Sequence, residues 1–161
     1  MSALDRLLGT WEVTMHHSAM SGPVTGRQRD ERVLDGAFVL RRCTSDYPDV
    51  PDAMALLSDS PCHSFDVHGL IRVFHLAIDD GWLMIRLDKD FPQRFTTRFR
   101  GPDAMERTRE RSEDAGAPWQ PDFTMTSRRV ESGSWRRPQK GPHTAPVVAG
   151  WPLSTRGEEA P

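Results

Sequence analysis

Apolar and polar residues alternate along most of this chain, from about residue 10 to about residue 130. At the start of this region Trp11, Val13 and Met15 share one face, and polar residues occupy the other. A period of two residues is typical of β-strands that bury one face. The pattern predicts roughly ten short strands, at residues 10–16, 24–34, 37–44, 54–58, 63–67, 70–78, 82–87, 93–100, 105–112 and 122–130.

Turn-forming residues separate the predicted strands. Asp80 and Gly81 form the clearest turn, because Asp-Gly readily adopts the positive φ angles of a tight hairpin. Many short strands with closely spaced turns favour an antiparallel sandwich or barrel, and closure removes exposed sheet edges. We therefore predict an all-β fold, an up-and-down antiparallel β-barrel of roughly ten strands.

The two ends of the chain break the alternation. Ser2 can cap a short N-terminal helix that contains three leucines, and Gly9 can end it. Residues 131–161 contain five prolines and four glycines and show no period, so we expect a disordered tail. The predicted organisation is one barrel domain at residues 1–130 followed by a Pro/Gly-rich tail at residues 131–161.

Composition and charge narrow the classes of protein. The 161 residues carry a net charge of −2, which provides no overall basic field for nucleic acid. No segment approaches the roughly 20 apolar residues of a membrane-spanning helix, and the first residues lack the apolar core of a signal peptide. Cys43 and Cys62 are too few for a disulfide framework. We expect a cytoplasmic protein without a nucleic-acid or membrane partner; a homodimer is compatible with the sequence.

Three segments carry a resemblance to a known family. Residues 7–13 resemble the Leu-x-Gly-Thr-Trp opening of calycin barrels, the superfamily of lipocalins and fatty-acid-binding proteins. Residues 63–69 with 72–74, and residues 110–129, resemble the later strands of an actinobacterial barrel family labelled "domain of unknown function" or "lipocalin-like". The resemblance implies a closed barrel around an interior cavity. At Arg109 the chain departs from the family, which often has an aromatic residue at this position, so the resemblance would place this arginine in the usually apolar interior.

Related barrels suggest three functions: holding small apolar ligands, binding haem, and cyclising polyene or polyketide substrates. Haem needs an axial ligand. The glycines that nitrobindin-like haem proteins carry after the opening Trp are missing after Trp11, and residues 123–130 contain no histidine. The resemblance therefore favours an organic ligand over haem, and we expect no cofactor.

His63 is the first candidate for acid–base chemistry. It alternates with Phe65 and Val67, so it is expected on an inward face, where a neutral imidazole can act as a general base. The alternative is a structural histidine, paired with a backbone carbonyl or with Asp66.

Three arginines share strand faces with large apolar side chains. Arg72 lies on the face of Phe74, which leaves His75 to solvent, and Arg42 and Arg86 also accompany apolar residues. A buried guanidinium must be paired, either with a carboxylate of the chain or with the acid or enolate group of a ligand. Arg42 and Arg72 are therefore candidates for stabilising developing negative charge.

Arg107, Arg109 and Arg111 form a second group of arginines, on one face of a single strand with Glu106 and Glu110 opposite. We expect this group to face solvent. No histidine and cysteine spacing matches a zinc site, and adjacent histidines on a strand point to opposite faces, so no metal site is predicted.

The expected cavity wall is mainly aromatic. Its predicted members, besides Arg86, are Trp11, Met15, Phe38, Phe65, Phe74, Trp82, Phe95, Phe99, Phe123 and Met125. An apolar wall with a few arginines and one histidine suits an amphipathic or polyketide-like organic ligand with an anionic or carbonyl end. The leading hypothesis is a ligand-binding barrel that acts as a cofactor-independent cyclase or isomerase, with His63, Arg72 and Arg42 in catalytic roles. The alternative is a non-catalytic carrier.

Overall fold

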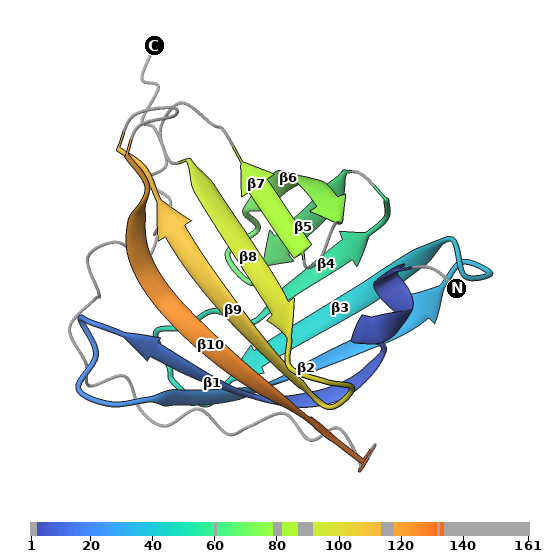
Figure 1. Cartoon of the computed structure of the whole chain (residues 1–161), viewed down its shortest axis with the longest axis horizontal. Coiled ribbons are helices and arrows are strands. Elements are labelled where there is room, and N and C mark those ends of the chain that lie inside the picture. The colour runs from blue at the N-terminus through green and yellow to red at the C-terminus, as the bar shows by residue number, and fades with distance from the viewer. Residues whose placement is uncertain are drawn as a thin grey trace.

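Ten antiparallel strands form a closed β-barrel in the computed structural model of the chain (Figure 1). The structure describes residues 3–59, 61–78, 82–86, 92–113, 118–131 and 133, and within β7 the side chains of residues 83–85. The strands are β1 (Gly9–His17), β2 (Val24–Val33), β3 (Phe38–Ser45), β4 (Ala53–Leu57), β5 (Cys62–Asp66), β6 (Ile71–Ile78), β7 (Trp82–Arg86), β8 (Gln93–Phe99), β9 (Ala104–Arg111) and β10 (Gln120–Val130).

The strand order confirms the predicted up-and-down topology. Each strand pairs with its neighbours in the sequence, and β1 pairs with both β2 and β10. The ladder between β1 and β10 runs from the Thr10–Val130 pair to the His17–Phe123 pair and closes the barrel. Every expected strand boundary lies within two residues of the observed one.

A short 3-10 helix, η1 (Ala3–Leu7), precedes the barrel. It buries Leu4 and Leu7 in the main apolar cluster. The indole Nε1 of Trp11 donates a hydrogen bond of 2.7 Å to the backbone oxygen of Leu7, which fixes the helix to β1. The predicted N-terminal helix is therefore present as one tight turn. In the described part of the chain we find no helix with the length and apolar character needed to span a bilayer.

The observed strand faces differ from the prediction in β3 and β5. Val39 and Arg41 of β3 are buried, so Phe38, Leu40 and Arg42 point outward; their predicted inward orientation was wrong. In β5, Cys62 is fully buried, so His63 and Phe65 also point outward, again against the prediction.

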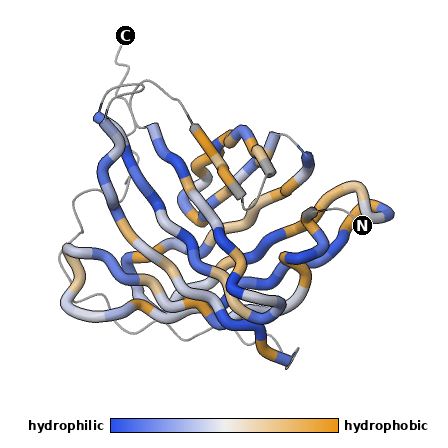
Figure 2. Tube along the Cα trace, in the orientation of Figure 1, coloured by the Kyte–Doolittle hydropathy of each residue, from blue (hydrophilic) through white to orange (hydrophobic). Residues whose placement is uncertain are grey.

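Exposed apolar residues explain these errors. Met54, Ile71 and Val73, which flank Phe65 and His63 in the sheet, are 43 to 60% exposed. Figure 2 shows that hydrophobic residues are concentrated along β4 to β7, whereas β2 is largely hydrophilic. The outer face of the sheet around β5 is therefore apolar, and its inner face is partly polar. For this reason hydrophobicity indicated the wrong inward face for β5.

The arginines of β9 also differ from the prediction. Arg107 and Arg109 are 8% and 4% exposed and lie inside the barrel, not on a solvated face. They pair in register with inward residues of both neighbouring strands, Arg107 with Met125 and Arg109 with Phe95 and Phe123. On β6 the prediction is confirmed, because Phe74 is buried and His75 is exposed.

Candidate functional site

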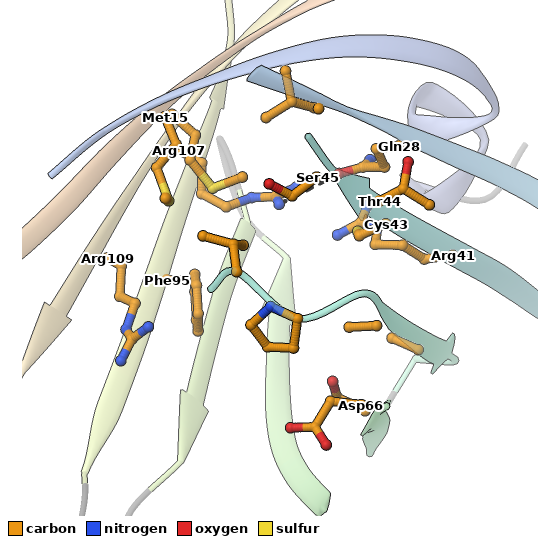
Figure 3. A pocket seen from close by; sticks show the side chains of 18 of the residues that line it. Met15, Gln28, Arg41, Cys43, Thr44, Ser45, Asp66, Phe95, Arg107 and Arg109 are labelled. Carbon is orange, nitrogen blue, oxygen red and sulfur yellow. Dashed lines mark hydrogen bonds between the residues drawn. The ribbon is translucent and has the colours of Figure 1, made fainter. Parts of the chain in front are cut away.

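A cavity of about 220 Å³ lies inside the barrel (Figure 3). Side chains from nearly every strand line it, because alternate residues of each strand point inward. Its apolar wall includes Val13, Met15, Ala55, Phe74, Met84, Phe95, Phe123 and Met125. Against this wall stand four arginines that are about nine-tenths buried or more: Arg41, Arg72, Arg107 and Arg109.

Arg41 of β3 belongs to a fully satisfied polar network. Its Nε and Nη2 atoms donate hydrogen bonds of 2.9 and 2.8 Å to the two carboxylate oxygens of Asp30. The amide Nε2 of Gln28 donates to the same carboxylate at 2.8 Å. Burial lowers the pKa of Arg41, but the Asp30 carboxylate more than offsets this and raises the pKa above its usual value. This bidentate pair holds β2 against β3.

Arg107 of β9 reaches from the opposite side of the cavity toward Gln28 and Ser45 (Figure 3). Its Nε donates to the hydroxyl of Thr97 at 3.1 Å, and its Nη1 makes a long contact of 3.4 Å with Oε1 of Gln28. Among the described residues its Nη2 has no hydrogen-bond partner. Burial, with repulsion from Arg41, lowers the pKa of Arg107 to about 10.

Arg109 belongs to a chain of polar contacts that also includes Asp122 and His17. Its Nε lies 2.9 Å from one carboxylate oxygen of Asp122, and the other oxygen lies 3.2 Å from Nε2 of His17. The guanidinium carbon stands 4.9 Å from the ring centroid of Phe123 and 5.8 Å from that of Phe95. Burial lowers the pKa of Arg109 to about 10, although Asp122 acts in the opposite direction.

Arg72 of β6 forms the remaining pair. Its Nη1 donates to Oδ2 of Asp66 at 3.1 Å, and both side chains line the cavity. The other carboxylate oxygen of Asp66 accepts the backbone N–H groups of His68 and Leu70, at 3.0 and 3.1 Å. One carboxylate therefore fixes both the β5–β6 turn and the cavity arginine.

Cys43 is the thiol of the cavity wall, next to Arg41 and Arg107. Burial raises the pKa of its thiol, although both guanidiniums act against this. The side chain therefore stays protonated near neutral pH. Within the described ranges, no three His, Cys, Asp or Glu side chains gather as a metal site requires.

The structure brings about half of the sequence-predicted residues to the cavity. Arg72, Met15, Phe74, Phe95, Phe123 and Met125 line it. Trp11 and Phe99 pack in or against the core cluster without lining the cavity. His63, Arg42, Phe38 and Phe65 point outward, where Arg42 pairs with Glu31. The side chains of Trp82 and Arg86 lie outside the described residues.

Strand patterning missed the buried polar residues of the site: Gln28, Arg41, Arg107 and Arg109 line the cavity, and Asp30 holds Arg41. The missing information was register. Phe95 and Phe123 were correctly expected inside, and both stand opposite Arg109 in the ladders. Side chains at paired positions share a face, so this pairing by itself places Arg109 inside.

No protein-family model matches the chain, and no curated protein matches its sequence. Solved structures match at the level of fold. An S-type phycobiliprotein lyase from Guillardia theta has a TM-score of 0.50 and 12% identity, over 81% of this chain and 92% of that one. A protein of unknown function from the DUF3598 family of Nostoc punctiforme has a TM-score of 0.51 and 14% identity, over 81% and 50%.

A de novo designed fluorescence-activating β-barrel also matches, with a TM-score of 0.46 and 15% identity over 81% of this chain and 99% of that one. At these identities a likeness concerns the fold alone. The chain therefore has the fold of closed β-barrels of the lipocalin-like type.

Proposed function

We propose that this protein binds a small amphipathic organic molecule inside its barrel. The observation that carries the proposal is the cavity, whose apolar wall of methionine and aromatic side chains surrounds a few fixed polar groups. This combination is typical of small-molecule sites, where apolar area provides affinity and a few polar groups provide orientation. The lipocalin-like fold supports the same conclusion.

The cyclase or isomerase hypothesis depended on His63 as a proton shuttle. His63 and Arg42 both lie on the outer face of the barrel. Arg72 is therefore the one proposed catalytic residue that remains in the cavity. The proposal is therefore ligand binding, and the non-catalytic carrier is its simplest form. A phycobiliprotein lyase of the same fold supports keeping catalysis as a second hypothesis.

Two further expectations from the sequence, on family membership and on cellular location, accompany this proposal. We propose membership of the actinobacterial lipocalin-like family on the motifs at residues 7–13, 63–69 and 110–129. We also propose a cytoplasmic location, on the sparse cysteines. Neither affects the test of binding.

The test is a fluorescence titration with 1-aminoanthracene, a neutral apolar probe of suitable size. We expect saturable binding to one site, which the cavity-filling variant Ala55→Phe weakens at least about tenfold, because Ala55 is a buried residue of the wall. Ala77→Phe is the matched control, since Ala77 is exposed on β6. Circular dichroism checks that both variants fold.

Two results would contradict the proposal. The first is an absence of saturable binding to the wild-type chain. The second is equal probe affinity in a folded Ala55→Phe variant, the Ala77→Phe variant and the wild type, because the probe would then bind elsewhere.

A further inference from the structure

We propose that Arg107 forms an anion subsite in the cavity, and that the ligand is an organic carboxylate whose acidic group binds to its guanidinium. This inference rests on the proposed function and specifies the ligand class of the same cavity. It concerns an arginine that strand patterning placed in solvent and that the structure places inside the barrel.

The four buried arginines of the cavity differ in their partners. Arg41, Arg72 and Arg109 each have a nitrogen within 3.1 Å of a carboxylate oxygen, belonging to Asp30, Asp66 and Asp122 respectively. Arg107 is only 8% exposed, and its hydrogen-bond partners among the described residues, Thr97 and Gln28, are both neutral.

Arg107 still offers hydrogen-bond donors to a ligand. Within the described part of the chain, its Nε donates to Thr97 at a normal distance, its Nη1 makes only the 3.4 Å contact with Gln28, and its Nη2 has no hydrogen-bond partner. The unoccupied edge of the guanidinium therefore carries two N–H groups side by side. Two parallel N–H donors match the two oxygens of one carboxylate.

Apolar side chains lie next to this edge of the guanidinium. Arg107 stands next to Met125 in the ladder of β9 and β10, and the apolar wall continues through Met15 and Val13 on β1. A ligand can therefore place its acid at Arg107 while its carbon chain lies along the wall. Asp30 sits nearby but is held by Arg41 and Gln28, so it does not compete for Arg107.

Electrostatics favours an anion over a neutral carbonyl group. Burial and Arg41 together destabilise the charged form of Arg107, which lowers its pKa to about 10. A carboxylate next to the guanidinium would reverse this effect, whereas a neutral oxygen would only satisfy a hydrogen bond.

The experiment measures competition for the 1-aminoanthracene site by octanoate and by 1-octanol, which have chains of similar length but differ in charge. We expect octanoate to bind the wild-type protein about tenfold or more tightly than 1-octanol. In Arg107→Met the preference for octanoate over 1-octanol should disappear. Arg107→Lys should retain part of the preference, since it keeps the charge but loses the planar fork.

Arg42→Met is the matched control, because Arg42 lies on the outer face and should leave the octanoate preference intact. The inference is overturned if wild type binds both compounds equally or if Arg107→Met keeps the preference. If the probe, octanoate and 1-octanol all fail to bind the wild type, the proposed function itself fails, and the two failures are thus distinguishable.

Discussion

Arg41 and Arg107 are both buried inside the barrel, but of the two only Arg41 forms an ion pair with a carboxylate of the described residues. A buried ion pair loses its compensation when one partner is removed, and the remaining charge then stays in a low-dielectric environment. A buried cation without a counterion is in that unfavourable situation already. The two arginines should therefore affect stability in opposite directions, although they face the same cavity.

The prediction is that Arg41→Met lowers the free energy of unfolding by about 3–5 kcal/mol, because Asp30 becomes an unpaired buried carboxylate. Arg107→Met should raise it by about 1 kcal/mol in the absence of ligand, since the removed desolvation penalty exceeds the two lost hydrogen bonds. Guanidinium unfolding curves of the three proteins measure both changes.

Arg42→Met serves as the control for the chemistry of the substitution. Arg42 is 41% exposed in its pair with Glu31, so its replacement should change the free energy of unfolding by no more than about 0.5 kcal/mol. A loss of stability in Arg107→Met comparable to that in Arg41→Met would show that Arg107 is already compensated within the chain.

At the scale of the elements, alternation predicted where strands begin and end but not always which face points inward. In β6 the prediction was right, because Phe74 and Leu76 make the face that they share with Arg72 more apolar than the face of Val73, His75 and Ala77. In β3 each face carries both apolar side chains and an arginine, so the pattern alone does not indicate which face points into the barrel. The pairing of Arg41 with Asp30, 11 residues away, decides it and is invisible to a local pattern.

Gly26 of β2 lies where this strand closely approaches β3. A Cβ atom at this position would lie 2.3 Å from the backbone oxygen of Thr44, so β2 and β3 could not keep their separation. We predict that Gly26→Ala lowers the free energy of unfolding by about 2 kcal/mol and weakens probe binding, because Gly26 also borders the cavity.

Gly22→Ala is the matched control, since nothing lies within 4 Å of the added Cβ. Chemical unfolding and the 1-aminoanthracene titration measure the two effects. Equal stability of the two alanine variants would mean that β2 and β3 can separate locally without cost.

At the scale of the whole molecule, the barrel depends on one ladder between distant parts of the chain. β1 and β10 are more than 100 residues apart in sequence, and their eight paired positions close the sheet. The sequence favoured closure only through the number of strands and the need to avoid exposed edges. It also placed the end of the barrel at residue 130, which is the last residue of β10.

The position of that last residue leads to a prediction about residues 131–161, which the sequence assigns to a disordered tail. A chain that ends at Gly133 keeps all ten strands, so we predict an unchanged midpoint of guanidinium unfolding and unchanged 1-aminoanthracene affinity. A chain that ends at Thr126 is the control, because it loses the partners of Thr10, Trp11, Glu12 and Val13 and reopens the barrel. This shorter chain should lose cooperative unfolding. If ending the chain at Gly133 weakens binding or stability, residues beyond the barrel contribute to the cavity or the fold, and the predicted boundary at residue 130 is wrong.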